Sequence, residues 1–122
     1  MLDYSIFRYK YMHRFKDLEI WKLSRIFCKL IYEITETFSE KEKFGIINQM
    51  RRASVSIPSN IAEGASRKSN KDFSRFLEIA IGSCYELETQ LLLSNDLGFL
   101  TNNKLEELLI DLNKIIQMTS KF

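Results

Sequence analysis

Apolar residues recur at every third or fourth position along most of the chain, the spacing that places side chains on one face of an α-helix. The pattern becomes regular from Asp17 onward. One stripe comprises Ile20, Leu23, Phe27, Leu30 and Ile34, and a second stripe beside it comprises Trp21, Cys28, Ile31 and Phe38. Such a broad apolar surface predicts a helix that contacts more than one neighbour, and the same breadth would serve an oligomer interface.

A second helix is predicted from Ser39, because Ser39 and Glu42 have the spacing of a capping box. Its inward face comprises Ile46 or Ile47, Met50, Ala53, Ile57 and Ile61. Small residues keep the helix narrow, so that a neighbour can come close: Ala53, Ser54, Ser56, Ser59 and Ala62. Gly64 is expected to adopt the left-handed conformation that commonly ends a helix, followed by a polar connection over 65–70.

Two further helices complete the pattern. Ser69 and Asp72 repeat the capping form, and Thr101 is a candidate cap for the last helix. The third stripe, which runs toward Gly98, comprises Phe73, Phe76, Leu77, Ala80, Cys84, Leu87 and Leu91, and the fourth comprises Leu105, Leu108, Leu109, Leu112, Ile115 and Ile116. No segment is typical of a strand, and the connections are short. The chain is therefore predicted to be all-α, an antiparallel up-and-down four-helix bundle.

Pro58 falls inside the second predicted helix. A proline there removes one backbone hydrogen bond and clashes with the carbonyl of Ser54, at a cost of about 3 kcal/mol. We therefore expect a kink near Pro58, with the hydroxyls of Ser54 and Ser56 close to the freed carbonyls. The kink would let the helix wrap around its neighbours, or it would shape a groove or a subunit contact, and the sequence leaves both readings open.

Length and composition fit a single soluble domain. A chain of 122 residues is too short for two cores, so we expect a tail or extension over 1–14 and one bundle domain over 15–122. Apolar residues make up 45% and charged residues 28%, and four Gly with one Pro leave room for few, long elements. No run approaches the roughly 20 apolar residues of a membrane span, and no signal peptide is visible. The expected location is the cytoplasm, without a membrane partner.

The charges are unevenly distributed, although the net charge is only +2. Basic residues concentrate in one part of the chain: Arg51, Arg52, Arg67, Lys68, Lys71 and Arg75, opposed there only by Glu63 and Asp72. From Leu77 to Asp111 acidic residues dominate. The basic residues flank one predicted helix connection, so they are the candidate contacts to the phosphates of RNA or DNA. Ordinary solvated charges at the end of a bundle are an equally weighted alternative.

The sequence contains few of the residue patterns that catalysis or metal binding requires. Di-iron bundles need Glu-x-x-His motifs, which the sequence lacks, and its single histidine is His13 in the tail. Cys28 and Cys84 form no C-x-x-C pair and are expected to be buried thiols. Glu86 and Glu88 diverge by about 200° around a helix and cannot act together on one substrate. We expect neither an enzyme, nor a cofactor, nor a metal site.

Several segments between Phe15 and Leu100 resemble the 23S rRNA-intervening sequence proteins of bacteria: FKDLEIWKLS, EKFGIINQM, QMRRASVSIPSNIAEG and FSRFLEIAIGSCYELETQL. The resemblance implies a four-helix bundle that assembles as a homopentamer. Residues 1–11 extend beyond the usual beginning of such proteins, which would make Met12 the start. A more distant resemblance, to the accessory protein of diversity-generating retroelements, implies association with a reverse transcriptase and nucleic acid.

The most specific motif also holds polar residues whose role has two readings. Arg52, Asn60 and Glu63 are polar among apolar neighbours. Arg52 and Glu63 could fix helix register through ion pairs across helices, for example from Arg52 or Arg75 to Glu86, or these polar residues could contact phosphate. Pro58, Gly64 and Glu86 are assigned structural roles in the same motifs.

Some apolar residues remain after the main stripes are counted: Trp21, Ile26, Ile31, Ile79, Ile81 and Tyr85. This surplus predicts self-association. The function classes left open are an oligomeric nucleic-acid-binding protein and a protein–protein adaptor.

Overall fold

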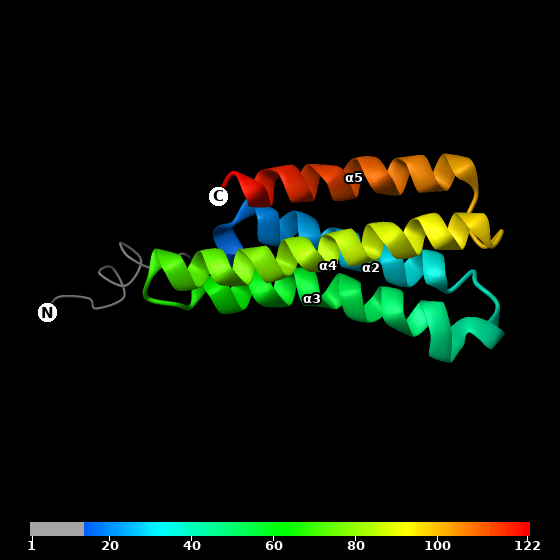
Figure 1. The fold of residues 1–122 in the computed structure, drawn as a ribbon, viewed down its shortest axis with the longest axis horizontal. Coiled ribbons are helices and arrows are strands. Elements are labelled where there is room, and N and C mark those ends of the chain that lie inside the picture. The colour runs from blue at the N-terminus through cyan, green and yellow to red at the C-terminus, as the bar shows by residue number, and fades with distance from the viewer. Residues whose placement is uncertain (1–13) are drawn as a thin grey trace, which may run out of the picture.

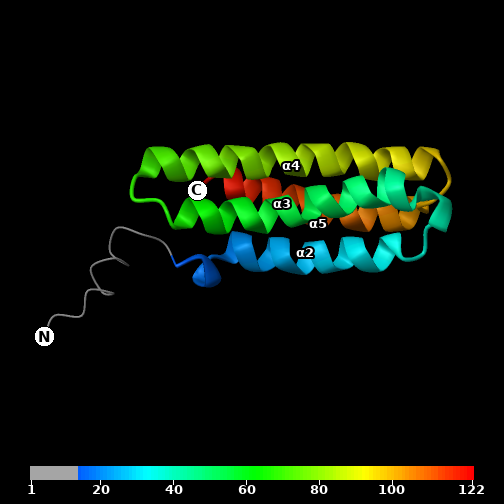
Figure 2. The same cartoon turned by 90° about the horizontal axis from the view of Figure 1, so that it is seen from below.

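The structure is a computed structural model that describes residues 14–122. The predicted tail, with His13 and the possible start at Met12, lies outside the described residues except for Arg14. The described part contains four long α-helices and no strand: α2 (Glu19–Thr35), α3 (Asn48–Ala65), α4 (Asn70–Asp96) and α5 (Asn102–Ser120). Successive helices run in opposite directions (Figures 1 and 2). The predicted all-α four-helix bundle is confirmed.

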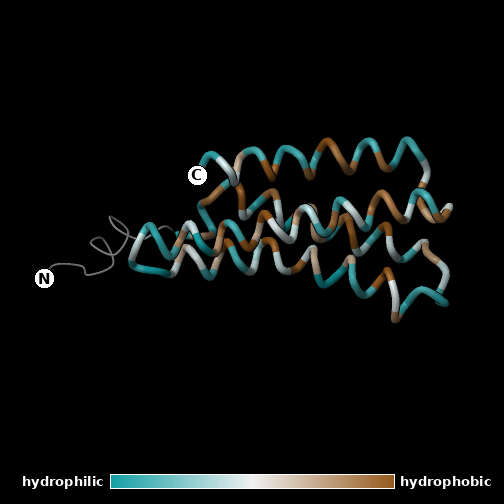
Figure 3. Tube along the Cα trace, in the orientation of Figure 1, coloured by the Kyte–Doolittle hydropathy of each residue, from teal (hydrophilic) through white to brown (hydrophobic). Residues whose placement is uncertain are grey.

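The core lies along the common axis of the four helices, where apolar positions recur on each one (Figure 3). Its most completely buried large side chains include Phe27, Ile31, Met50, Ile57, Ile61, Leu87, Leu91 and Leu112. These residues fall at the predicted helical spacing on α2, α3, α4 and α5, so burial of one face of each helix accounts for the fold.

The inward face of α2 differs from the prediction. Its buried residues are Ile20, Ser24, Phe27, Ile31 and Thr35, a stripe that lies between the two predicted ones. Ser24 and Thr35 are tolerated there because their hydroxyls donate to carbonyls of the same helix, at 2.9 Å to Trp21 and 2.7 Å to Ile31. Ile31, which was counted as surplus, is fully buried.

The segment after α2 does not form the predicted start of a regular α-helix. A 3-10 helix η2 (Glu40–Glu42) is followed by a π-helical turn η3 (Lys43–Ile47), and α3 begins at Asn48. Ser39 accepts from the backbone nitrogen of Lys41 at 3.4 Å. Gly45 has φ −108° and ψ −116°, far from helical values, and it interrupts the hydrogen-bond register of an α-helix.

Pro58 lies inside α3, which is continuous from Asn48 to Ala65. The hydroxyl of Ser54 donates to the carbonyl of Arg51 at 2.8 Å, and the hydroxyl of Ser56 pairs with that of Ser83 at 2.8 Å. The two serines therefore bond elsewhere than to the carbonyls that the proline frees. A kink near Pro58 stays a prediction.

The two later helix starts are as predicted. The side-chain oxygen of Ser69 accepts from the backbone nitrogen of Asp72 at 3.1 Å, and that of Thr101 from Lys104 at 3.3 Å. Between 14 and 122, no helix combines the length and apolar character needed to cross a membrane.

Candidate functional site

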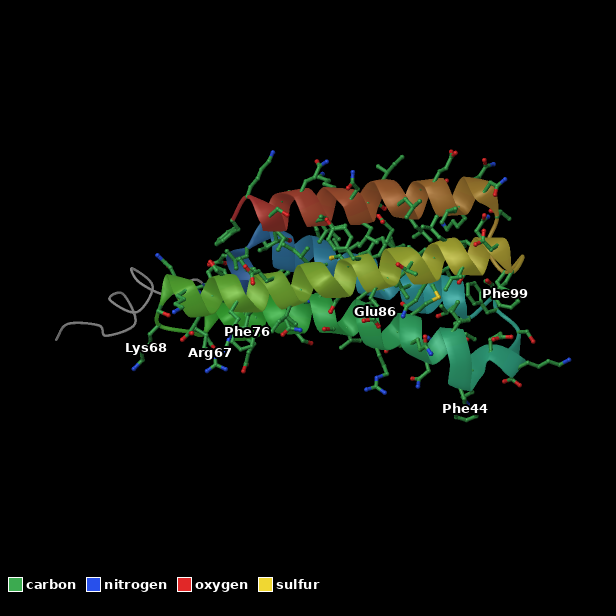
Figure 4. All side chains as sticks on the ribbon, in the orientation of Figure 1. Phe44, Arg67, Lys68, Phe76, Glu86 and Phe99 are labelled. Carbon is green, nitrogen blue, oxygen red and sulfur yellow. The ribbon has the colours of Figure 1, made fainter. Side chains whose placement is uncertain are left out.

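Four of the predicted basic residues lie together where α3 passes into α4: Arg67, Lys68, Lys71 and Arg75. We call them the basic connection patch. All four are exposed, and Figure 4 shows Arg67 and Lys68 pointing away from the bundle at this end. Lys68 and Lys71 form no ion pair with any described residue. Their charges are therefore available to an anionic ligand.

The ring of Phe76 organises the two arginines of the patch. The guanidinium carbon of Arg67 lies 4.9 Å from the ring centroid, and that of Arg75 lies 5.3 Å from it. Arg67 also donates to Oε1 of Glu63 at 2.7 Å. Stacking on an aromatic ring orients a guanidinium while leaving its edges free for hydrogen bonds. The sequence predicted Phe76 only as a core residue. Its second role, as the ring on which the two arginines stack, could have been inferred from the adjacent Arg75.

Gly64 explains how the patch is held, and it corrects a prediction. Gly64 is buried inside α3 and does not take the left-handed conformation; the glycine with positive φ in the described chain is Gly98, at +82°. A Cβ added at Gly64 would lie 2.8 Å from Cβ of Phe76 and 2.9 Å from Cδ1 of Phe73. The missing side chain lets the end of α3 press against the start of α4, which fixes the connection between them.

Arg51 and Arg52 do not join the other four basic residues. They lie near the start of α3, about 20 Å from the patch at 1.5 Å per residue. Arg51 donates to the side chains of Thr35 and Glu36, each at 2.9 Å, and stacks on Tyr32 with its guanidinium carbon 4.7 Å from the ring centroid. Arg51 therefore joins α2 to α3. The expectation that all six basic residues gather at one end was wrong.

The remaining motif residues make local contacts. Asn60 donates to the carbonyl of Ser56 at 2.8 Å, within α3. Glu86 is exposed and its Oε1 accepts from Gln90 at 3.3 Å (Figure 4). No ion pair joins Glu86 to Arg52 or Arg75 in the described part of the chain. Glu63 instead pairs with Arg67, four residues further along the chain, and the ion pair that joins two helices is the one between Arg51 and Glu36.

No group of three potential metal-ligating side chains occurs between 14 and 122. Of the two cysteines, Cys84 is buried and Cys28 half-buried. Burial raises the pKa of the Cys84 thiol to about 12, which keeps it protonated and unreactive near neutral pH.

The six apolar residues that were expected to be surplus divide into three groups by their exposure. Ile26, Ile79 and Tyr85 are 59%, 45% and 54% exposed. Trp21 and Ile81 are half-buried, and Ile31 belongs to the core. Three of the six residues counted as surplus are therefore exposed on the outer faces of α2 and α4.

A family model described as "23S rRNA-intervening sequence protein" matches residues 16–121. Among solved structures, a protein of unknown function from the S23 ribosomal protein family of Bacteroides thetaiotaomicron VPI-5482 is similar, with 26% sequence identity and a TM-score of 0.74. The alignment covers 82% of this chain and 94% of that one. No curated protein matches the chain.

Proposed function

The chain belongs to the 23S rRNA-intervening sequence protein family, and from that premise we propose that it is a non-enzymatic protein that binds RNA through the basic connection patch. The single observation that carries the proposal is the exposure of Lys68 and Lys71, which pair with no carboxylate of residues 14–122, beside two arginines oriented by Phe76. Three carboxylates lie near in sequence, Glu63, Asp72 and Glu78, against four cations, and Glu63 is bonded to Arg67. The patch keeps an excess of positive charge that suits a phosphate backbone.

Self-association is the second part of the proposal. The exposed Ile79 and Tyr85 of α4 support an assembly of several copies, and the family resemblance implies a homopentamer. An assembly would bring several basic connection patches to one RNA. Each added copy would raise the apparent affinity by effective concentration, without any new kind of contact.

The salt dependence of RNA binding tests the patch. We expect the affinity of the protein for a structured RNA to fall steeply with salt, with a slope that decreases by about 1.5 when Lys68 and Lys71 are both replaced by Ala. The matched control is the Lys41→Ala/Lys43→Ala variant, which removes two exposed lysines at the opposite end. The control should keep the slope of the unmodified protein. An equal decrease of the slope in both variants, or an affinity that does not change with salt concentration, would contradict the proposal.

A protein–protein adaptor is the second candidate function. Phe44 and Ile110 are 89% and 71% exposed, a degree of exposure that a partner protein would relieve. Figure 4 shows Phe44 projecting from the bundle, at the end opposite to Arg67. A reverse transcriptase is the partner that the distant resemblance suggests. Purified protein that is monomeric by light scattering, and that binds RNA only after such an enzyme is added, would favour the adaptor.

A further inference from the structure

The outward face of the first half of α2 carries basic and aromatic side chains that the proposed function does not use. An open groove there is lined by Phe15, Lys16, Trp21, Lys22, Arg25, Ile26 and Lys29, and we call it the α2 groove. Phe15 belongs to a short 3-10 helix, η1 (Phe15–Asp17), that precedes α2. Four of the seven lining residues are cationic, and no carboxylate is among them.

The aromatic part of the groove forms a connected platform. The rings of Phe15 and Trp21 meet edge to face, with centroids 5.2 Å apart and an interplanar angle of 73°. The guanidinium carbon of Arg25 lies 5.4 Å from the Trp21 ring centroid. Trp21 is half-buried and Arg25 is exposed. Nucleobases stack on both aromatic rings and guanidinium planes, so the platform presents two kinds of surface on which a base can lie.

Little of the positive charge in the groove is neutralised. Lys22 lies 3.8 Å from a carboxylate oxygen of Glu19, and Lys29 lies 3.9 Å from one of Glu33. Both contacts are long and solvent-exposed, and pairs of this kind are weak. Lys16 and Arg25 have no ion-pair partner among residues 14–122.

The α2 groove and the basic connection patch lie at the same end of the bundle. Because α2 and α3 are antiparallel, the start of α2 is next to the end of α3, and η1 packs against α3. Figure 2 shows the start of α2 and the connection from α3 to α4 at one end of the molecule.

We propose that the α2 groove binds an unpaired stretch of RNA, with bases stacked on Trp21 and Arg25 and phosphates held by Lys16, Lys22 and Lys29. The inference rests on the proposed RNA-binding function and adds a preference for single strands. A duplex keeps its bases stacked on each other and offers nothing to the platform. An acidic peptide would satisfy the cations and leave the aromatic surface without a partner.

Trp21 is the only tryptophan of the chain, so its fluorescence reports on this groove alone. We expect a single-stranded oligouridylate to quench Trp21 fluorescence at low salt, and a duplex of the same phosphate concentration to leave it nearly unchanged. Arg25→Ala should weaken the binding of the single strand about fivefold, because it removes one stacking surface. The Lys22→Ala/Lys29→Ala variant should bind the single strand more weakly than Arg25→Ala does. The Lys41→Ala/Lys43→Ala variant should bind it as the unmodified protein does. All the substituted residues are exposed, and circular dichroism checks that the variants fold.

Fluorescence anisotropy of labelled RNA, measured in parallel, separates this inference from the function on which it rests. Anisotropy that shows RNA binding while Trp21 fluorescence stays constant overturns the α2 groove and leaves the basic connection patch standing. Quenching that persists in a Lys68→Ala/Lys71→Ala variant supports the groove as a site of its own. Equal quenching by duplex and single strand overturns the stacking, and a failure of all RNAs to bind overturns both proposals. A fluorescence change caused by anionic lipid vesicles and by no RNA would assign the groove to a membrane surface instead.

Discussion

Replacing Gly64 with alanine tests whether close packing of α3 on α4 holds the basic connection patch in place. In a helix, alanine is favoured over glycine by about 1 kcal/mol. The new Cβ would lie 2.8 Å from Cβ of Phe76, an atom fixed to the α4 backbone, and 3.3 Å from the carbonyl oxygen of Phe73. Relief therefore requires the two helices to separate, and overpacking of this kind costs about 1–3 kcal/mol. The clash involves backbone as well as side chain, so we take the upper half of that range and expect a net loss of about 1–2 kcal/mol in the free energy of unfolding.

Gly82 provides the matched control. It lies within α4, and a Cβ added there would meet no atom within 4 Å, so Gly82→Ala should gain about 1 kcal/mol from helix propensity alone. The two variants should then differ by about 2–3 kcal/mol in urea unfolding. Both must be measured at one protein concentration, because assembly raises apparent stability. A Gly64→Ala variant as stable as Gly82→Ala would refute the claim that the two helices are in tight contact.

Three further predictions concern single side chains. Arg51→Ala should lower the free energy of unfolding by about 1–2 kcal/mol in urea titrations, because Arg51 hydrogen-bonds to the end of α2, whereas exposed Arg52→Ala should change it by less than about 0.5 kcal/mol; equal effects would contradict the assignment. Ser69→Ala should lower the thermal midpoint through a lost cap of about 1 kcal/mol, and Ser69→Asp should preserve it. Between pH 9 and pH 12 the Cys84 thiol ionises only in the unfolded chain, since burial raises its folded pKa to about 12, so stability should fall as pH rises by up to about 1.4 kcal/mol per unit. Cys84→Ala should remove that part of the pH slope, and an unchanged slope would show that the thiol is not buried.

The sequence predicted the later half of the bundle better than the earlier half. Ser69 and Thr101 cap α4 and α5, because their side chains accept hydrogen bonds from backbone nitrogens of the first turn, and the apolar spacing of both helices is regular. The segment 39–47 also starts with a serine, yet Gly45 departs from helical torsion angles and delays α3 to Asn48. A capping pattern reports a local preference, and it does not reveal whether the following turns keep α-helical register.

Side-chain roles were harder to predict than helices, because they depend on which elements meet. Gly64 has the same neighbours in sequence whether it ends a helix or accommodates a phenylalanine of the next one, and only the packing of α4 decides between them. Arg51 and Arg52 are adjacent in the chain, but a helix turns about 100° per residue. One of them therefore faces Tyr32 on α2 and the other faces solvent.

The up-and-down topology itself decides which charges can cooperate. Each connection reverses the chain, so the start of the first helix and the connection between the second and third helices meet at one end. Lys16 and Lys68 are far apart in sequence and share that end, whereas Arg52 and Lys68 are closer in sequence and lie at opposite ends of α3. A cluster counted along the chain therefore includes Arg52 of α3, which lies away from that end, and omits the cations at the start of α2, which lie at it. For a bundle of this topology, charges should be summed by end before a nucleic-acid interface is assigned, and on that count the cations at the start of α2 share an end with the basic connection patch.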